Sequence, residues 1–151
     1  ERINHLFKRI ELGAEAGYDD FRKAEKSLDN QPIKRMSKLT EGILGSIDYS
    51  TIAKKRVENY TFLNRHLCKR NCINLEFDNK CVPMIYPFLS NDEHIRRMLL
   101  NSKVYVAKYW QSVLDDCEVS EIERRLVEDI LPLMIDQRYR EEEMNYIKNV
   151  L

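Results

Sequence analysis

The chain has 151 residues, of which 43% are hydrophobic and 33% are charged, so it is long and apolar enough for one globular core and too apolar for a disordered chain. Lysine plus arginine equals aspartate plus glutamate, at 25 each, so no overall charge favours nucleic acid or an anionic membrane, and neither is expected as a partner. No stretch has the length of a membrane span or the pattern of a signal peptide, which favours a cytoplasmic protein.

The first 70 residues are predicted to be helical. The chain begins without methionine, and apolar side chains already stand in helical register at Ile3, Leu6, Phe7 and Ile10, which is typical of a fragment of a longer protein. Helices are then predicted over residues 18–29, 32–47 and 50–70, because apolar side chains recur there at intervals of three and four. Pro32 suits the first position of the second of these helices.

Three short segments in the second half are predicted strands. They are rich in β-branched, aromatic and aliphatic residues and cover residues 82–89, 104–110 and 131–135. A proline removes one donor from a sheet, so the two segments that contain proline are expected at sheet edges.

Helices are expected to alternate with these strands. Ser90 with Glu93, and Ser120 with Glu123, match the capping box that starts a helix, and a final helix is expected over residues 140–151. The predicted fold class is therefore α+β, with a helical N-terminal half followed by a small three-stranded sheet backed by helices. In this organisation residues 1–48 are a helical segment, and residues 49–151 are a small α+β domain.

The sequence offers little for phosphate, metal or acid–base chemistry. Its four glycines build no Gly-rich turn between a strand and a helix, so no phosphate cradle is predicted. His66, Cys68, Cys72 and Cys81 lack the paired spacing of a zinc site, so no metal is expected. The histidines have no nucleophile partner by sequence, and the basic run at residues 54–56 is interpreted as a solvated helix face. No catalytic residue is predicted on this chain.

The end of the chain resembles a known enzyme family. The segments VPMIYPFL, HIRRMLLNSKVYVAKYW and LPLMIDQRYREEEMNYIKNVL are similar to the C-terminal part of sugar aminotransferases of the DegT/DnrJ type, which are fold type I enzymes that use pyridoxal phosphate. The likeness is most specific at residues 136–139, where the family closes with an apolar strand, an Asp-Gln-Arg-Tyr turn and a helix that opens with acidic residues. Trp110 fits an aromatic turn of the family, although Gln111 stands where proline is usual.

The resemblance implies the small C-terminal domain of such an enzyme. A large domain earlier in the same polypeptide would hold pyridoxal phosphate and supply the lysine that binds it, so no cofactor is expected on this chain alone. The complete enzyme would be a homodimer that moves an amino group from an amino acid, such as glutamate, to a nucleotide-linked keto sugar. The implied substrate-side candidates are Lys108, Tyr109, Trp110, Gln137, Arg138 and Tyr139.

Three alternatives stay open at this point. Arg138 can clamp the last helix to the sheet and Tyr139 can belong to the core, in which case neither contacts a substrate. The whole protein can keep the fold as a non-catalytic binding or interaction module. The first three helices can also present an apolar groove to a partner as a module of their own.

Overall fold

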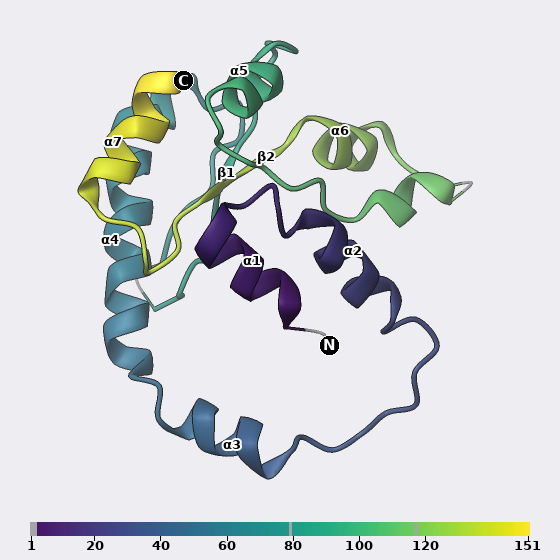
Figure 1. The fold of residues 1–151 in the computed structure, drawn as a ribbon. Coiled ribbons are helices and arrows are strands. Elements are labelled where there is room, and N and C mark those ends of the chain that lie inside the picture. The colour runs from purple at the N-terminus through teal and green to yellow at the C-terminus, as the bar shows by residue number, and fades with distance from the viewer. Residues whose placement is uncertain (1–2, 79, 117) are drawn as a thin grey trace. The chain divides into compact units, whose positions relative to one another are not determined.

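The computed structural model describes residues 3–78, 80–116 and 118–151, and the chain divides into two units, Glu1–Ile47 and Asp48–Leu151 (Figure 1). Within the described ranges there are seven α-helices and one two-stranded antiparallel sheet, so the α+β class is confirmed.

The first unit is helical. Helices α1 (Asn4–Leu12) and α2 (Tyr18–Lys26) contact one another through an edge-on contact between His5 and Phe21 and through an ion pair of 2.6 Å between Lys8 and Asp20. Gly17, just before α2, is buried against α1.

The third helix begins later than the sequence predicts. Residues 31–37 have no regular structure, and α3 covers only Lys38–Gly45. Its N-cap is Ser37, whose extended backbone lets the side-chain oxygen accept a hydrogen bond from the Thr40 amide at 3.1 Å. The prediction of a helix from Pro32 is therefore wrong in its first six positions, because a capping serine further along the chain starts the helix instead.

Gly17 provides a test of the contact between α1 and α2. A Cβ atom at this position would lie 2.5 Å from the carbonyl oxygen of His5 and 2.9 Å from Cγ of Arg9, so we expect Gly17→Ala to separate the two helices. A Cβ atom at Gly42, inside α3, meets nothing within 4 Å, so we expect Gly42→Ala to stabilise that helix by roughly 0.5–1 kcal/mol. Amide hydrogen exchange in α1 and α2 should accelerate in the first variant only, and equal exchange in both would contradict this packing.

The second unit begins with its longest helix, α4 (Tyr49–Leu67), which continues as a short 3-10 turn, η1 (Cys68–Arg70). The predicted helix over residues 50–70 is thus confirmed. Asp48 caps it by accepting a hydrogen bond from the Thr51 amide at 3.0 Å. The Thr51 hydroxyl and amide, together with the Ser50 hydroxyl, lower the pKa of Asp48 to about 2.

One face of α4 carries the core of this unit. Tyr60, Leu63 and Leu67 are buried on it at helical spacing, against α7 (Glu141–Val150) and the first strand. Figure 1 shows α4 and α7 running beside each other. Met144 and Ile147 supply the matching apolar side of α7, which confirms the predicted last helix.

Strand β1 (Ile85–Phe88) pairs antiparallel with β2 (Leu131–Met134), and Pro87 faces Pro132 in the register. Proline has no amide hydrogen, so this facing pair cannot exchange ladder bonds, and the bonds fall to the pairs on either side. Both strands contribute buried side chains to the core, including Tyr86, Phe88 and Leu133.

The third predicted strand, residues 104–110, is not part of this sheet. Its inward side chains Val104 and Val106 are buried as a strand would bury them, but the segment has no strand pairing. The Arg96 side chain takes the place of ladder bonds: one terminal nitrogen donates to the carbonyl oxygens of Val106 and Ala107, at 3.3 and 3.5 Å, and the other donates to that of Ile130 at 2.9 Å. The segment is thus held beside the start of β2 by a guanidinium group, and a three-stranded sheet is not observed.

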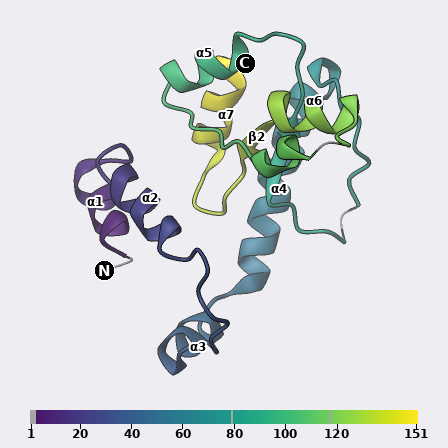
Figure 2. The ribbon, with the colours of Figure 1, turned by 90° about the vertical axis from the view of Figure 1, so that its right-hand side faces the viewer.

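Helices α5 (Ile95–Asn101) and α6 (Glu121–Asp129), with the 3-10 turn η2 (Gln111–Asp115), complete the unit. Figure 2 shows α5 near α7, with which it is in contact. The capping box of Ser120 and Glu123 is confirmed, with amide-to-side-chain bonds of 3.2 and 2.9 Å. No helix in the described ranges is both long and apolar enough to cross a membrane.

The predicted capping box of Ser90 and Glu93 is wrong. The Ser90 oxygen accepts from the Asp92 amide at 3.1 Å, two residues on, which forms a turn instead of a helix start. Helix α5 begins only at Ile95, and its N-cap, His94, has no side-chain capping bond.

Candidate functional site

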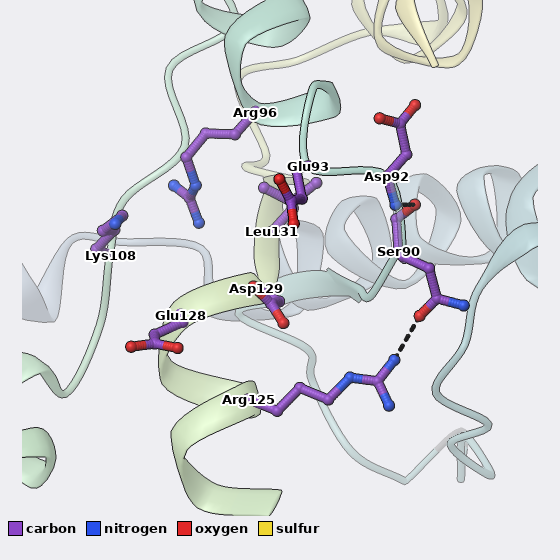
Figure 3. A pocket seen from close by; sticks show the side chains of 10 residues that line it. Ser90, Asp92, Glu93, Arg96, Lys108, Arg125, Glu128, Asp129 and Leu131 are labelled. Atoms are coloured by element: carbon purple, nitrogen blue, oxygen red, sulfur yellow. Dashed lines mark hydrogen bonds between the residues drawn. The ribbon is translucent and has the colours of Figure 1, made fainter. Parts of the chain in front are cut away.

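The second unit contains a cavity of about 410 Å³ between the turn before α5, helix α6 and the segment of residues 104–110 (Figure 3). Charged side chains of both signs dominate its wall, and Leu131, the first residue of β2, is the one apolar residue among the described residues that line it. The basic members are Arg96, Lys108 and Arg125, and the acidic members are Asp92, Glu93, Glu128 and Asp129.

Two of the three cations are already engaged. Arg96 holds the backbone carbonyls of two chain segments, as described above, and burial lowers its pKa while the charge of Asp129 opposes that shift. Arg125 donates to the side-chain oxygen of Asn91 at 2.6 Å, which fixes α6 to the turn before α5. These two arginines therefore form part of the cavity's frame.

Four of the remaining charged side chains have no close partner in the described ranges. Within the part of the chain that the structure describes, Lys108, Glu93, Glu128 and Asp129 have no hydrogen bond or ion pair of their side chains. In Figure 3, Arg96, Lys108 and Glu128 lie on the left of the view, and the carboxylates of Glu93 and Asp129 lie to their right, with Glu93 beside Leu131. The cavity thus presents an ammonium group and carboxylates to the same space.

Of the six substrate-side candidates, only Lys108 lines this cavity. Tyr109 and Trp110 follow it as a tilted aromatic pair, with ring centroids 5.5 Å apart, and Trp110 is 64% exposed. Trp110 has a φ of 54°, a left-handed conformation that is rare for an aromatic residue. A proline at position 111 would disfavour this backbone conformation of Trp110. Gln111, which stands where the sugar aminotransferases usually have proline, permits it and is the first residue of η2.

The other candidates lie at the far end of β2, in a turn that is tied to α4. Asp136 accepts from the Arg138 side chain at 2.7 Å and from the Arg138 amide at 3.0 Å, and it lies 3.6 Å from a guanidinium nitrogen of Arg56. Arg56 also donates to the side-chain oxygen of Gln137 at 3.1 Å. The Arg138 side chain is 71% exposed, but its guanidinium is used to bind Asp136.

The backbone of the same turn is anchored by Asn59. This residue of α4 is only 2% exposed, and its side-chain nitrogen donates to the carbonyl oxygens of Ile135, Asp136 and Tyr139 at 3.4, 3.1 and 3.2 Å. Tyr139 itself is half-buried and packs against the core. Residues 136–139 therefore join the end of β2 to α4, and the contacts of Gln137 and Tyr139 are internal to the protein.

The electrostatics of the turn give a pH-dependent prediction. Burial alone would raise the pKa of Asp136, but hydrogen bonds from Arg138 and the charges of Arg138 and Arg56 outweigh it and lower the pKa below its ordinary value. A carboxyl whose pKa is lower in the folded state stabilises the fold above its unfolded pKa, and this contribution is lost as the pH falls through the folded value.

We therefore expect Asp136→Asn to lessen the loss of stability between neutral pH and about pH 3. Urea unfolding at several pH values measures this slope, with the exposed carboxyl variant Glu76→Gln as the control. A slope that is the same in wild type and in Asp136→Asn would show that this carboxyl is not stabilised by its two arginines.

The structure does not bring the two groups of candidates together. Lys108 lines the same cavity as Leu131, the first residue of β2, whereas residues 136–139 lie beyond the other end of that strand. Sequence reasoning missed Arg96 and Arg125, which frame the cavity. The available signal was the position of Arg96 between Ile95 and Leu99, which are both buried, because a cation at the edge of an apolar helix face must find acceptors.

No metal site is formed by the residues that the structure describes, since no three or more of their histidine, cysteine, aspartate or glutamate side chains are grouped closely enough. Cys68, Cys72 and Cys81 are exposed free thiols. The cavity does not fit pyridoxal phosphate either, because its wall carries four acidic side chains and the half-buried Arg96 is committed to backbone carbonyls. No family model, no curated protein and no solved structure matches the chain.

Proposed function

We propose that the chain is the C-terminal part of a pyridoxal-phosphate-dependent aminotransferase that acts on a nucleotide-linked keto sugar. The observation that carries this proposal is the sequence of residues 131–151, where an apolar strand, an Asp-Gln-Arg-Tyr turn and an acidic helix start follow one another as they do in sugar aminotransferases of the DegT/DnrJ type. The turn at residues 136–139 is tied to α4 by Arg56 and Asn59, so this segment has a structural role in the chain.

In this proposal the 151 residues are inactive alone. Transamination needs a lysine that binds the cofactor covalently, an acidic partner for its ring and a phosphate-binding site. The cavity of the second unit does not suit the phosphate group, because four acidic side chains line it and Arg96 binds backbone carbonyls. The proposal therefore assigns these tasks to a large domain earlier in the same polypeptide. The amino donor would be an amino acid such as glutamate, and the complete enzyme would be a homodimer in the cytoplasm.

Mass spectrometry of the protein expressed from its natural reading frame tests the proposal. We expect a product larger than this chain which, after treatment with pyridoxal phosphate and borohydride, carries the cofactor on one lysine outside the 151 residues. The 151-residue chain treated in the same way is the control and should carry no stable modification. A stable modification within these residues, or a natural product of the same size, would refute the proposal.

Arg138 separates a structural role from substrate contact in the complete enzyme. Because its guanidinium is bound to Asp136, we expect Arg138→Ala to leave kcat/KM for the sugar substrate unchanged. Trp110→Ala is the companion variant, since this exposed ring is free to meet a substrate. A large loss of kcat/KM in Arg138→Ala, with thermal stability intact, would instead assign this arginine to substrate binding.

A second candidate function is a non-catalytic interaction module. The exposed apolar side chains of the first unit favour it, since Phe7 of α1, Leu39 of α3 and Ile10 are 57%, 75% and 82% exposed. The same mass and cofactor experiment decides between the two candidates, because a natural product that binds no pyridoxal phosphate would leave the interaction module.

A further inference from the structure

The cavity framed by Arg96 and Arg125 holds opposite charges apart. Lys108 lies in the segment that Arg96 fixes through the carbonyls of Val106 and Ala107, whereas Asp129 is the last residue of α6. Arg125 fixes α6 in turn to the loop that carries Glu93. Arg96 also binds the carbonyl of Ile130, next to Asp129, so it ties the two segments together. In the described residues no ion pair closes between the ammonium group of Lys108 and the carboxylates.

Any one of these charges is stable in water, so its exposure alone needs no ligand. A shared cavity imposes a further condition, because a guest must suit every charged group that it meets. A dicarboxylate would be repelled by Glu93 and Asp129, and a diamine would be repelled by Lys108 and by the Arg96 guanidinium. A molecule with one charge of each sign can place its cation beside Glu93 and Asp129 and its anion beside Lys108, where the carboxylate of Glu128 is the one group of like charge on that side among the described residues (Figure 3).

We propose that this cavity binds a small linear zwitterion, with a primary ammonium group between Asp129 and Glu93 and a carboxylate at Lys108. The cavity volume of about 410 Å³ lies within the range of ordinary small-molecule sites, roughly 300–1,000 Å³. Leu131, the apolar residue of the lining, is 3% exposed and offers a small apolar contact to the chain of such a molecule. The proposal does not depend on aminotransferase activity, since it concerns binding to this chain alone.

Calorimetric titration of the 151-residue chain at low salt tests it with three probes of equal chain length: δ-aminovalerate, cadaverine and glutarate. Each charge-assisted contact that a probe cannot form lowers its affinity, so we expect δ-aminovalerate to bind about tenfold more tightly than either symmetric probe. Equal affinity of all three probes, or no binding of δ-aminovalerate, would overturn the proposal.

Variants at the two ends of the site should act differently. We expect Lys108→Gln to remove the preference for δ-aminovalerate over cadaverine, and Asp129→Asn to remove its preference over glutarate. Lys69→Gln, an exposed residue of η1 outside the cavity, is the matched control and should change neither preference. Far-UV circular dichroism checks that each variant is folded, and Glu93→Gln replaces Asp129→Asn if that variant is not. Unchanged preferences in Lys108→Gln would also overturn the proposal.

Discussion

Replacing Leu99 by alanine is expected to lower the free energy of unfolding of the second unit by about 2–5 kcal/mol, because a buried leucine loses both its transfer free energy and its packing contacts. Leu99 is 0% exposed and belongs to the core cluster that joins α5 to the sheet and α7. The backbone of Leu99 also has a structural contact, since its carbonyl oxygen accepts a hydrogen bond of 2.8 Å from the amide of Val104, the first residue of the 104–110 segment.

The next residue supplies the matched control. Leu100 occupies the same helix but is 45% exposed, so Leu100→Ala should cost less than about 1 kcal/mol. Urea unfolding, followed through amide hydrogen exchange in β1 and β2, reports on the second unit without interference from the first. Equal losses in the two variants would contradict the placement of Leu99 in the core.

The second large effect is expected at Asn59. Leucine has nearly the same shape, so Asn59→Leu removes the three hydrogen bonds to the carbonyls of Ile135, Asp136 and Tyr139 without leaving a cavity. Buried carbonyls that lose their donor cost free energy, and we expect a loss of about 2–4 kcal/mol. The same amide-exchange measurement detects it, with the sharpest acceleration in β2 and the turn.

Asn64 on the same helix provides the comparison. It is half-buried and accepts one bond, from the Tyr86 hydroxyl at 3.3 Å, so Asn64→Leu should cost only about 1 kcal/mol. Unfolding of Asn59→Leu and Asn64→Leu at the same urea concentration would show that Asn59 does not stabilise the turn more than an ordinary side-chain hydrogen bond does.

Periodicity and capping residues predicted much of the second unit. The stripe of Tyr60, Leu63 and Leu67 identified α4, and the capping box at Ser120 identified the start of α6. The predictions of a helix start at Ser90 and of a third strand failed because a side chain formed hydrogen bonds with backbone groups that the predicted element would have used. Ser90 made a turn instead of a cap, and Arg96 bound the carbonyls that a third strand would have offered to its neighbour.

The candidate site was less accessible to sequence reasoning. Lys108 was singled out on the basis of a resemblance, and the structure places it in a cavity whose other members come from distant parts of the chain, such as Glu93 and Asp129. Contacts of that kind have no signature in local spacing. The grouping of Gln137, Arg138 and Tyr139 at the end of a strand was evident from the sequence. Arg56, which binds Gln137, and Asn59, which binds the carbonyl of Tyr139, lie roughly 80 positions earlier.

The facing prolines of the small sheet have a consequence for self-assembly. A two-stranded sheet has two open edges, and an edge with a regular row of donors and acceptors recruits strands from other molecules. Here the outward donor is missing at Pro87 and at Pro132, while the carbonyl of Pro87 is occupied by Asn71 at 2.8 Å and that of Ile130 by Arg96. Both edges therefore lack a regular row of donors, which disfavours amyloid-like growth on this small sheet.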